Sequence, residues 1–553
     1  MKLSKKAIFI ALALITALSL FLRFYHLGNL PWNMQEDEAM TGYVGRFIIQ
    51  NGKDLYGNKW PLLYFNKFGD YYIIGPIYMK GLATLLFGVN AFAVRFPTAL
   101  FGGLTVIPVY LLGALLFQNP LVGLFSAFVL AIMPWTIPLG RASSEGILGG
   151  FFFVYGIYYL LKAIKEKRIW PLVVGGLFIL FTFWIYHNYR VLSSLFVLGL
   201  VVYAYFDTKN KKAIRMGLVV LTTLFLLLTI AIGRTEWGRG RFDQTGILSP
   251  LSGVDIRINE LISGDTHVPA LVSRVFHNKL LGYGRELLHQ YFIYFSGDFL
   301  FIKGGKSEAY AVPESGLLHL TYLIPLFFLL VLLTNGKWMK DHYKDLLLIT
   351  YFVFLAPLPA ALTVVDAPNI QRSVLMGLLL AIPIGLGMYS FWEVTKKYKV
   401  FFVLLVVVIV GEMTIYMHNY VVHTDSFTSL YRNDGQRELI SYLKTHPANT
   451  VYLPTYGTMS MYYLFYTADF SPSYAGKFHH DVKIDRIKNV VFMDTECPSE
   501  KVKLSPGDIV VDPIIACNNN WAAKYNLKAK ITGKNNLIGF RVLEPRTQMS
   551  PTE

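Results

Sequence analysis

Long apolar segments, separated by short polar turns, occupy most of the first 420 residues. Eleven of these segments come close to the roughly 20 residues that an α-helix needs to cross a bilayer. The expected spans are 6–23, 97–116, 121–138, 147–163, 169–185, 191–206, 216–233, 316–334, 346–363, 373–391 and 399–417. One further apolar stretch, residues 72–88, is ambiguous, and its placement decides the topology of everything after it.

The chain becomes more polar after about residue 420. Asp434 to Thr445 has the periodicity of an amphipathic helix, and the short apolar runs after it, bounded by Pro, Gly and Asn, are typical of strands. The expected strands are Val451-Tyr452-Leu453, Val490 to Met493, Ile509-Val510-Val511 and Ile538 to Leu543. The pattern predicts a mostly α-helical protein with a transmembrane domain, residues 1–419, and a small α/β domain, residues 420–553.

The charge of the loops resolves the ambiguous stretch. If residues 72–88 lie on the membrane surface, the basic amino terminus and every strongly basic short loop fall on one side, as the positive-inside rule requires. These loops are Lys162 to Arg168, Asp207 to Arg215, Lys337 to Lys344 and Lys396 to Lys399. We therefore expect a multi-pass protein of the cytoplasmic membrane with an outer surface helix at 72–88. The loops 24–96 and 234–315 and the carboxyl-terminal domain are then extracytoplasmic.

Composition agrees with a membrane protein, since 54% of the 553 residues are hydrophobic, 16% are charged and the mean hydropathy is +0.44. The net charge of +16 gathers in short loops between apolar runs, so we expect membrane lipids and no nucleic acid as partners. The first apolar segment could also be a cleaved signal peptide, although no convincing small-residue cleavage site follows it. For Cys497 and Cys517, both in the tail, a disulfide and two free thiols are both open interpretations.

An acidic pair, Asp37-Glu38, follows the first apolar segment. Carboxylates at a membrane boundary are costly to desolvate and usually face water, a partner or a substrate. The stretch from Gln35 to Ala39 is therefore a candidate for a catalytic base. The alternative interpretation is an ordinary solvated loop.

Further charged residues lie in the other turns that this topology places outside. Arg141 and Glu145 are four residues apart, which fits one helical face and equally fits a capping ion pair. The turn from Tyr186 to Arg190 supplies His187 and Arg190, although its tyrosines also fit an aromatic belt at the membrane interface. The remaining candidates on this side are Lys67, Asp70 and Arg372. Together these carboxylates and cations suit a substrate with an anionic phosphate and a nucleophile to be deprotonated.

In this order the residues resemble a known family. The acidic pair is followed by Phe68-Gly69-Asp70-Tyr71, by the segment from Phe87 to Pro97, which reads FGVNAFAVRFP, and by the turn from Arg141 to Glu145. The first 200 or so residues resemble membrane glycosyltransferases of the GT-C fold, in particular protein O-mannosyltransferases and lipid A aminoarabinose transferases. The sequence departs from the family pattern at Tyr72 to Pro76, in place of a Pro-Pro pair, and at Ala309 to Ala311, in place of Arg-His.

The resemblance implies transfer of a monosaccharide from a polyprenyl-phosphate carrier to a lipid, glycan or protein acceptor on the outer face. It implies that Asp37 is the general base, with Glu38 beside it, and that Asp70 and Glu145 match further acidic positions. Arg141 and Arg190 match basic positions; with His187, Lys67 and Arg372 they are the expected contacts of the donor phosphate. The sequence shows no nucleotide fingerprint and no metal-ligand spacing, so we expect no cofactor and no metal.

Two other classes of function compete with a transferase. A membrane transporter or lipid flippase would also place polar groups between helices, but such proteins usually show inverted repeats and polar sites near the bilayer midplane. Here the middle of each span is nearly free of charge, and the polar groups gather at one face. A receptor or scaffold built around the outer domain would leave the acidic pair and Arg141 without a purpose.

Overall fold

The computed structural model describes residues 4–67, 69–206, 212–306, 309–455, 458–479, 481–534, 536 and 539–546. Its contacts divide the chain into two compact units. Unit 1 comprises residues 1–25 and 98–420, and unit 2 comprises residues 26–97 and 421–553. The hydrophobic pattern did not indicate that residues 26–97 group with the tail. Phe68, residues 207–211 of the basic loop and Ile538 lie outside the described residues.

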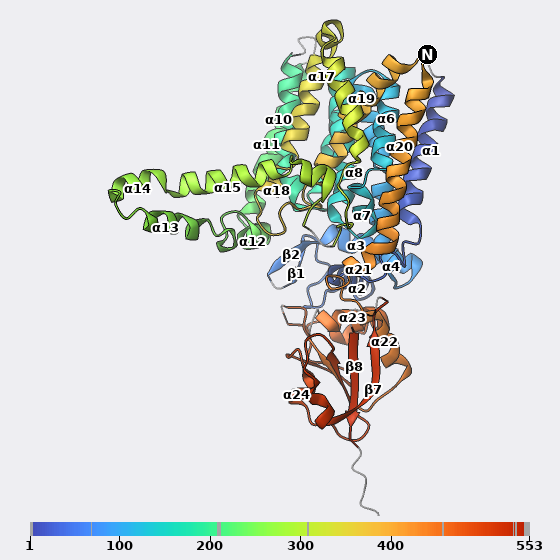
Figure 1. Cartoon of the computed structure of the whole chain (residues 1–553), viewed down its shortest axis with the longest axis vertical. Helices are drawn as coiled ribbons and strands as arrows, with labels where there is room; N and C mark the ends of the chain where they lie inside the picture. The colour runs from blue at the N-terminus through green and yellow to red at the C-terminus, as the bar shows by residue number, and fades with distance from the viewer. Residues whose placement is uncertain are drawn as a thin grey trace, which may run out of the picture. The chain divides into compact units, whose positions relative to one another are not determined.

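Unit 1 is a bundle of long apolar helices (Figure 1). In the described part of the chain, eight helices are long and apolar enough to cross a membrane. They are α1 (Lys5–Phe24), α4 with α5 (Ala91–Leu104 and Val106–Leu116), α8 (Glu145–Glu166), α10 (His187–Phe206), α11 (Lys212–Gly233), α17 with α18 (Gly336–Leu355 and Leu358–Ala361), α19 (Val374–Thr395), and α20 with η4 and α21 (Lys399–His418, Asn419–His423 and Thr424–Phe427). Helices suit a bilayer because they satisfy every backbone hydrogen bond within one segment.

The other three expected spans coincide with shorter apolar helices. These are α6 (Pro120–Ala131), α9 (Trp170–Thr182) and α16 (Leu323–Leu333), which the turn η3 (Leu320–Tyr322) precedes. Each of the eleven expected segments therefore contains a helix, and the predicted multi-pass bundle is confirmed. The short helix α7 (Thr136–Arg141) joins α6 to α8.

Helix α19 forms the centre of the bundle, and small residues allow its neighbours to approach closely. A Cβ atom on Gly385 would lie 2.4 Å from the Ser126 Oγ atom of α6, and one on Gly387 would lie 1.9 Å from the Pro325 carbonyl oxygen of α16. Such small residues are typical of packed membrane helices, where van der Waals contact replaces the hydrophobic effect. In contrast, α11 and α20 leave most of their apolar side chains exposed, as expected for surfaces that face lipid.

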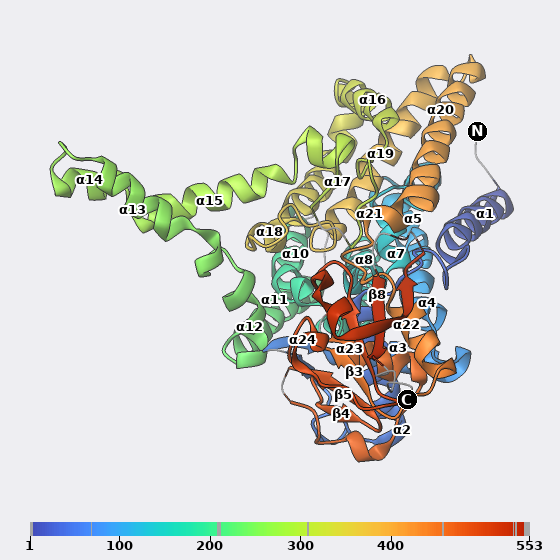
Figure 2. The ribbon, with the colours of Figure 1, turned by 60° about the horizontal axis from the view of Figure 1, so that its bottom comes forward.

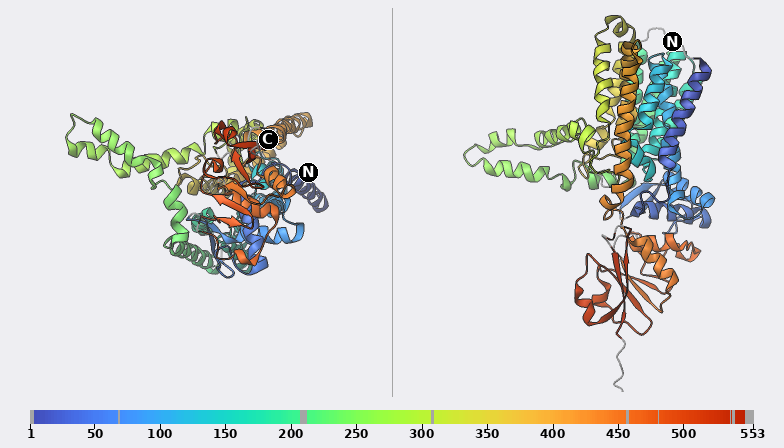
Figure 3. Two further views of the ribbon diagram at one scale, coloured as in Figure 1. Left: turned by 90° about the horizontal axis from the view of Figure 1, so that it is seen from below. Right: turned by 45° about the vertical axis from the view of Figure 1, so that its right-hand side comes forward.

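The long loop between α11 and α16 is largely helical. It contains α12 (Glu236–Thr245), η1 (Pro250–Ser252), α13 (Val254–Gly264), α14 (Ala270–Phe276), α15 (Lys279–Ile293) and η2 (Asp298–Ile302). Helices α13 and α15 pack against each other, and with α14 at its tip this pair projects sideways from the bundle of unit 1 (Figures 1 and 3). We call residues 254–293 the arm.

Unit 2 combines helices with a mixed six-stranded sheet (Figure 2). The strand order is β4-β5-β3-β6-β8-β7; β3 pairs in parallel with β5 and β6, and the other pairs are antiparallel. The strands are β3 (Val451–Pro454), β4 (Arg486–Ile487), β5 (Val490–Met493), β6 (Ile509–Pro513), β7 (Tyr525–Thr532) and β8 (Gly539–Pro545). The helices are α22 (Gln436–Thr445), α23 (Met459–Thr467), α24 (Pro498–Lys501) and the turns η6 (Pro472–Tyr474) and η7 (Asn519–Ala523). The predicted small α/β fold of the tail is confirmed.

The residues before the bundle also belong to unit 2. They form α2 (Glu36–Asn51), the hairpin of β1 (Tyr64–Lys67) and β2 (Asp70–Ile73), and α3 (Ile74–Phe87). The apolar stretch 72–88 is thus a 14-residue helix preceded by the end of a strand, shorter than the eight candidate spans. In the tail, Cys497 and Cys517 form a disulfide, which resolves the alternative left open by the sequence.

Candidate active site

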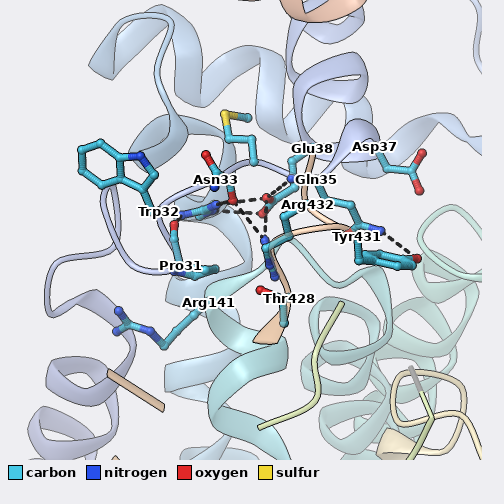
Figure 4. Close-up of polar contacts among 12 residues, drawn as sticks. Pro31, Trp32, Asn33, Gln35, Asp37, Glu38, Arg141, Thr428, Tyr431 and Arg432 are labelled. Carbon is cyan, nitrogen blue, oxygen red and sulfur yellow. Dashed lines mark hydrogen bonds and ion pairs between the residues drawn. The ribbon is translucent and has the colours of Figure 1, made fainter. Parts of the chain in front are cut away.

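The acidic pair lies in the first turn of α2. Glu38 closes the start of this helix, since its Oε2 atom accepts a hydrogen bond from the Gln35 backbone N–H at 3.0 Å. Glu36 and Asp37 complete an acidic first turn, which the positive end of the helix dipole stabilises. Successive helical residues point about 100° apart, so Asp37 and Glu38 enter different surroundings. Figure 4 shows the Asp37 side chain directed away from the contacts of Glu38.

Asp37 is partly exposed and is held from the side of the β1–β2 hairpin. Its Oδ1 atom accepts hydrogen bonds from the Tyr72 hydroxyl at 2.7 Å and from the Lys67 Nζ atom at 3.1 Å, while 41% of its side chain remains exposed. Lys67 also forms an ion pair with Glu36. Burial alone lowers the pKa of Lys67, but Asp37 and Glu36 outweigh burial and raise it above its ordinary value. The lysine therefore stays a cation beside an accessible carboxylate.

Asp70 lies at the other side of the hairpin turn. It pairs with Lys67 in the register of β1 and β2, and Gly69 between them adopts the left-handed conformation with φ of +76°. Glycine is the residue that adopts such a conformation without steric cost. The hairpin thus brings the predicted residues Lys67 and Asp70 to one turn and aligns Lys67 with Asp37.

Glu38 is enclosed by two arginines and has an exposed side-chain fraction of only 2%. Figure 4 shows Arg432 directed at the Glu38 carboxylate. Arg95 donates to both of its oxygens, at 3.0 and 3.1 Å, and Arg432 donates at 3.3 Å. Burial alone would raise the pKa of Glu38, but the charges of Arg95 and Arg432 outweigh it and lower the pKa. Arg95 also donates to the carbonyl oxygens of Leu27, Pro31 and Asn33. This cluster fixes the loop that leads into α2.

We expect Glu38→Gln to unfold unit 2 more easily, because the amide leaves two buried guanidinium groups without their counter-charge. Breaking a buried ion pair in this way commonly costs about 3–5 kcal/mol. A thermal unfolding scan of the purified protein in detergent measures the effect. Asp37→Asn is the matched control on the neighbouring, partly exposed residue, and equal unfolding temperatures for the two variants would contradict the structural role of Glu38.

Unit 1 contains a second cluster of predicted residues, gathered around a pocket of about 230 Å³. The first residues of α10, the last turn of α11, helix α12 and the segment 359–372 line it. His187, Arg190, Arg241 and Arg372 all belong to this lining. Three of these residues, His187, Arg190 and Arg372, are predicted phosphate contacts, and the fold brings them together from segments almost 200 residues apart.

The pocket holds its cations in fixed positions. Arg190 donates to the Phe183 carbonyl oxygen at 3.0 Å from Nη2, and its guanidinium lies 4.9 Å from the centroid of the Trp237 ring. Arg372 donates from Nη1 to the Thr363 hydroxyl and to the Val365 carbonyl, both at 2.8 Å. Burial lowers the pKa of Arg372, and the nearby charge of Arg241 adds to the effect. An anion in the pocket would offset this cost and stabilise the charged guanidinium groups.

Glu145 lies beside this pocket, and Arg141 is engaged elsewhere in unit 1. The Oε2 atom of Glu145 accepts a hydrogen bond from the Gln371 amide at 3.2 Å. Arg141 is fully buried and donates to the carbonyl oxygens of Leu22, Arg23 and Tyr25 at the end of α1 and to the Tyr420 hydroxyl. We assign Arg141 to the packing of these helix ends. Within the described ranges, the residue types that usually bind metal, His, Cys, Asp and Glu, form no group of three that could hold an ion.

Sequence reasoning missed four residues of these clusters: Tyr72, Arg95, Arg241 and Arg432. Arg95 lies in the segment FGVNAFAVRFP, which carried the family resemblance. Its presence in that motif could have identified it as a site residue. Tyr72 occurs where the chain departs from the family pattern, and its hydroxyl donates a hydrogen bond to Asp37. Arg241 and Arg432 lie in segments without a recognisable motif.

Comparison with known proteins supports the fold. Residues 74–236 match the family model described as dolichyl-phosphate-mannose-protein mannosyltransferase. No curated protein matches the chain. The structure of ArnT from Cupriavidus metallidurans bound to undecaprenyl phosphate is similar, with a TM-score of 0.52 at 11% identity, over 96% of this chain and 97% of that one.

The archaeal oligosaccharyltransferase AglB from Archaeoglobus fulgidus, in complex with an inhibitory peptide and a dolichol-phosphate, aligns with a TM-score of 0.49 at 12% identity. The alignment covers 84% of this chain, which spans 64% of that enzyme's length. At 11% identity the similarity to ArnT concerns the fold, and the resemblance inferred from the sequence is confirmed at that level. The chain is therefore a multi-pass membrane protein with the GT-C fold of membrane glycosyltransferases, and residues 74–236 match the protein mannosyltransferase model within that fold.

Proposed function

We propose that the protein transfers a monosaccharide from a polyprenyl-phosphate carrier to a hydroxyl or amine of a lipid, glycan or protein acceptor, on the outer face of the membrane. The observation that carries the proposal is the difference between the two neighbouring carboxylates. Asp37 is partly exposed and oriented by Tyr72 and Lys67, whereas Glu38 is locked between two arginines. A general base needs access to the proton it removes and a fixed position, and Asp37 meets both conditions.

The proposed reaction is a single displacement. Asp37 accepts the proton of the acceptor hydroxyl or amine as the acceptor's electron pair forms a bond to the anomeric carbon. The bond between that carbon and the phosphate oxygen breaks, and its electron pair leaves on the polyprenyl phosphate. Because attack and departure are on opposite faces of the sugar, the anomeric configuration inverts, as in inverting glycosidases. The leaving phosphate is already a stable anion, so no strong general acid is required.

The arginine pocket supports a phosphate as the leaving group. Arginine binds phosphate through two parallel hydrogen bonds, and Arg190, Arg241 and Arg372 line one pocket together with His187. Preorganised cations of this kind stabilise charge that develops on a departing oxygen. The carrier class is also suggested by the fold, since ArnT from Cupriavidus metallidurans binds undecaprenyl phosphate.

The direct test is transfer by the purified full-length protein in lipid nanodiscs. The donor is a polyprenyl-phosphate monosaccharide with a radiolabelled sugar, and the acceptors come from the extracted envelope of host cells. Mass spectrometry of glycans and glycolipids from cells with and without the gene identifies the product. We expect a sugar-bearing species that depends on the protein and on Asp37. Movement of the intact carrier across the membrane without transfer would instead support a lipid flippase.

The location of the site on the outer face predicts the result of cysteine labelling. The two native cysteines are joined in a disulfide, so an introduced cysteine gives the reactive thiol. We expect Lys59→Cys, in the loop after α2, to react with a membrane-impermeant maleimide added to intact cells. Lys337→Cys, at the start of α17, should react only after the membrane is opened. Both positions are exposed, and labelling of both from the same side would contradict the topology.

A further inference from the structure

The arm of unit 1 exposes an unusual amount of apolar surface for a segment outside the spans. The tip carries Leu271, Phe276 and Leu280, whose exposed fractions are 80%, 65% and 84%. The exposed apolar residues of the arm are Ile256, Leu261, Val268, Leu271, Val272, Val275, Phe276, Leu280, Leu281, Leu288 and Phe292. Contiguous apolar patches on an exposed segment mark sites of contact with a protein or a membrane.

The apolar residues of α15 lie on one face of this helix. Leu280, Leu281, Leu288 and Phe292 fall within about 120° of one another at 100° per residue. The opposite face packs on α13: a Cβ atom on Gly282 would lie 2.6 Å from Ile258, and Glu286 forms an ion pair with Arg257. The structure therefore leaves the apolar face of α15 uncovered and uses the polar face for the fold of the arm.

This face continues a surface that already faces lipid. At the base of the arm, the Phe295 ring stacks on Phe354 of α17 with centroids 5.0 Å apart, and the Tyr291 hydroxyl donates to the Phe354 carbonyl oxygen at 2.7 Å. Phe354 belongs to the span Gly336–Ala361 and is half exposed. The apolar surface of that span passes directly to Phe292 and Leu288 and onward to the tip.

The charges at the tip complement a membrane surface. From Thr266 to Arg285 the sequence contains three cations, Arg274, Lys279 and Arg285, between Asp265 and Glu286. Lys279 also forms an exposed ion pair with Asp255 of α13, at 3.4 Å. The loop that carries the arm starts close to the end of a span, since α12 begins three residues after α11 ends, and the arm leaves sideways from the bundle (Figures 1 and 3). Apolar residues flanked by cations on a helix at a span end are typical of interfacial segments.

We propose that the arm lies on the surface of the membrane that the chain spans, on the side where α11 ends. The apolar face of α15 and the tip are immersed at the boundary between headgroups and acyl chains. Arg274, Lys279 and Arg285 contact lipid phosphates at that level. A short segment with η1 joins the arm to α12, which carries Arg241 and Trp237, so immersion of the arm anchors one wall of the cationic pocket at the membrane surface. The inference concerns the arm itself and does not depend on the proposed transfer reaction.

Spin labels on introduced cysteines test this placement in the full-length protein in nanodiscs. Leu280→Cys and Leu288→Cys report on the apolar face. His289→Cys is the matched control, because His289 is exposed and points to the opposite side of the helix axis from Leu280. Oxygen concentrates in the bilayer, whereas a nickel chelate remains in water. We expect labels at 280 and 288 to collide several-fold more with oxygen than with the chelate, and the label at 289 to show the reverse.

Two outcomes would overturn the placement. Equal access of the nickel chelate to positions 280, 288 and 289 would place the arm in water. Shielding of positions 280 and 288 from both reagents would show that a protein surface, such as a second copy of the chain, covers the face.

The role of the cations is tested by lipid composition. In discs of phosphatidylcholine with added phosphatidylglycerol, we expect the label at 280 to lie deeper than in phosphatidylcholine alone. The double variant Arg274→Gln and Lys279→Gln should lose that difference. An unchanged depth in both compositions would refute the contact of these cations with anionic headgroups.

Discussion

Asp37→Asn is expected to abolish sugar transfer while the protein remains folded in the membrane. The amide keeps the shape of the side chain and still accepts hydrogen bonds from Tyr72 and Lys67, but it cannot take the proton of the acceptor. Loss of a general base commonly lowers the rate by ~10²–10⁴. The measurement is the initial rate of transfer with the labelled polyprenyl-phosphate sugar in nanodiscs, at saturating donor.

Two neighbouring variants separate the chemical role of Asp37 from its surroundings. Glu36→Gln removes the other carboxylate that pairs with Lys67 and should leave most of the activity. Tyr72→Phe removes one donor to Asp37 and should lower the rate to a smaller extent than Asp37→Asn, since the base itself remains. Near-normal turnover by Asp37→Asn would exclude Asp37 as the base, and Asp70 and Glu145 would be the next carboxylates to test.

Arg241→Gln is expected to weaken the use of the lipid-linked donor while acceptor use changes little. The charge-assisted hydrogen bonds of one guanidinium to a phosphate are worth enough to raise the donor KM roughly 10- to 100-fold. Arg241→Lys should restore part of the loss, because an ammonium keeps the charge but lacks the bidentate geometry. The corresponding variants of Arg190 and Arg372 would also remove bonds to backbone carbonyls, so loss of donor use in them would need a stability control.

Arg239 provides the matched control on the same helix. It is exposed, forms an i,i+4 ion pair with Asp243 and is outside the lining of the pocket. Arg239→Gln should leave the donor KM unchanged, and a high salt concentration should weaken donor binding by the parent protein more than by Arg241→Gln. If both variants raised the donor KM equally, the effect would reflect the general charge of α12, and the phosphate site would need to be sought elsewhere.

The sequence determined the parts of the fold that depend on whether a segment prefers water or an apolar environment. The eleven apolar segments predicted helices at the correct places because a segment in lipid must be apolar and must satisfy its own backbone. The strands of the tail around Val451, Val490 and Ile509 were also predicted, since each is a short apolar run bounded by turn residues. Strand β7 was missed because its exposed polar residues, such as Lys528 and Lys530, obscure the apolar pattern.

The sequence indicated which charged residues gather on one side of the chain, but it did not indicate the contacts that each of them makes. The acidic pair and the cations His187, Arg190 and Arg372 were identified because charge at a membrane boundary is costly and therefore informative. Arg141 was singled out with Glu145, four residues later, but the sequence did not indicate that it bonds to the end of α1 instead of lining the pocket. Its carbonyl partners at the end of α1 lie more than 110 residues earlier in the chain.

Only the tertiary structure shows that Asp37 is partly exposed and Glu38 is buried. The burial of Glu38 depends on Arg95 and Arg432, which reach its carboxylate from distant segments. The structure also shows that Arg241 of α12 lines the pocket. The sequence of a helix in a long loop does not indicate which part of the fold that helix will pack against. Hydropathy and helical periodicity follow from local composition, and so the sequence by itself determined the spans and the small α/β fold. The partners of a charged group are set by long-range packing, and therefore the fold decided which carboxylate stays exposed and which cations line the pocket.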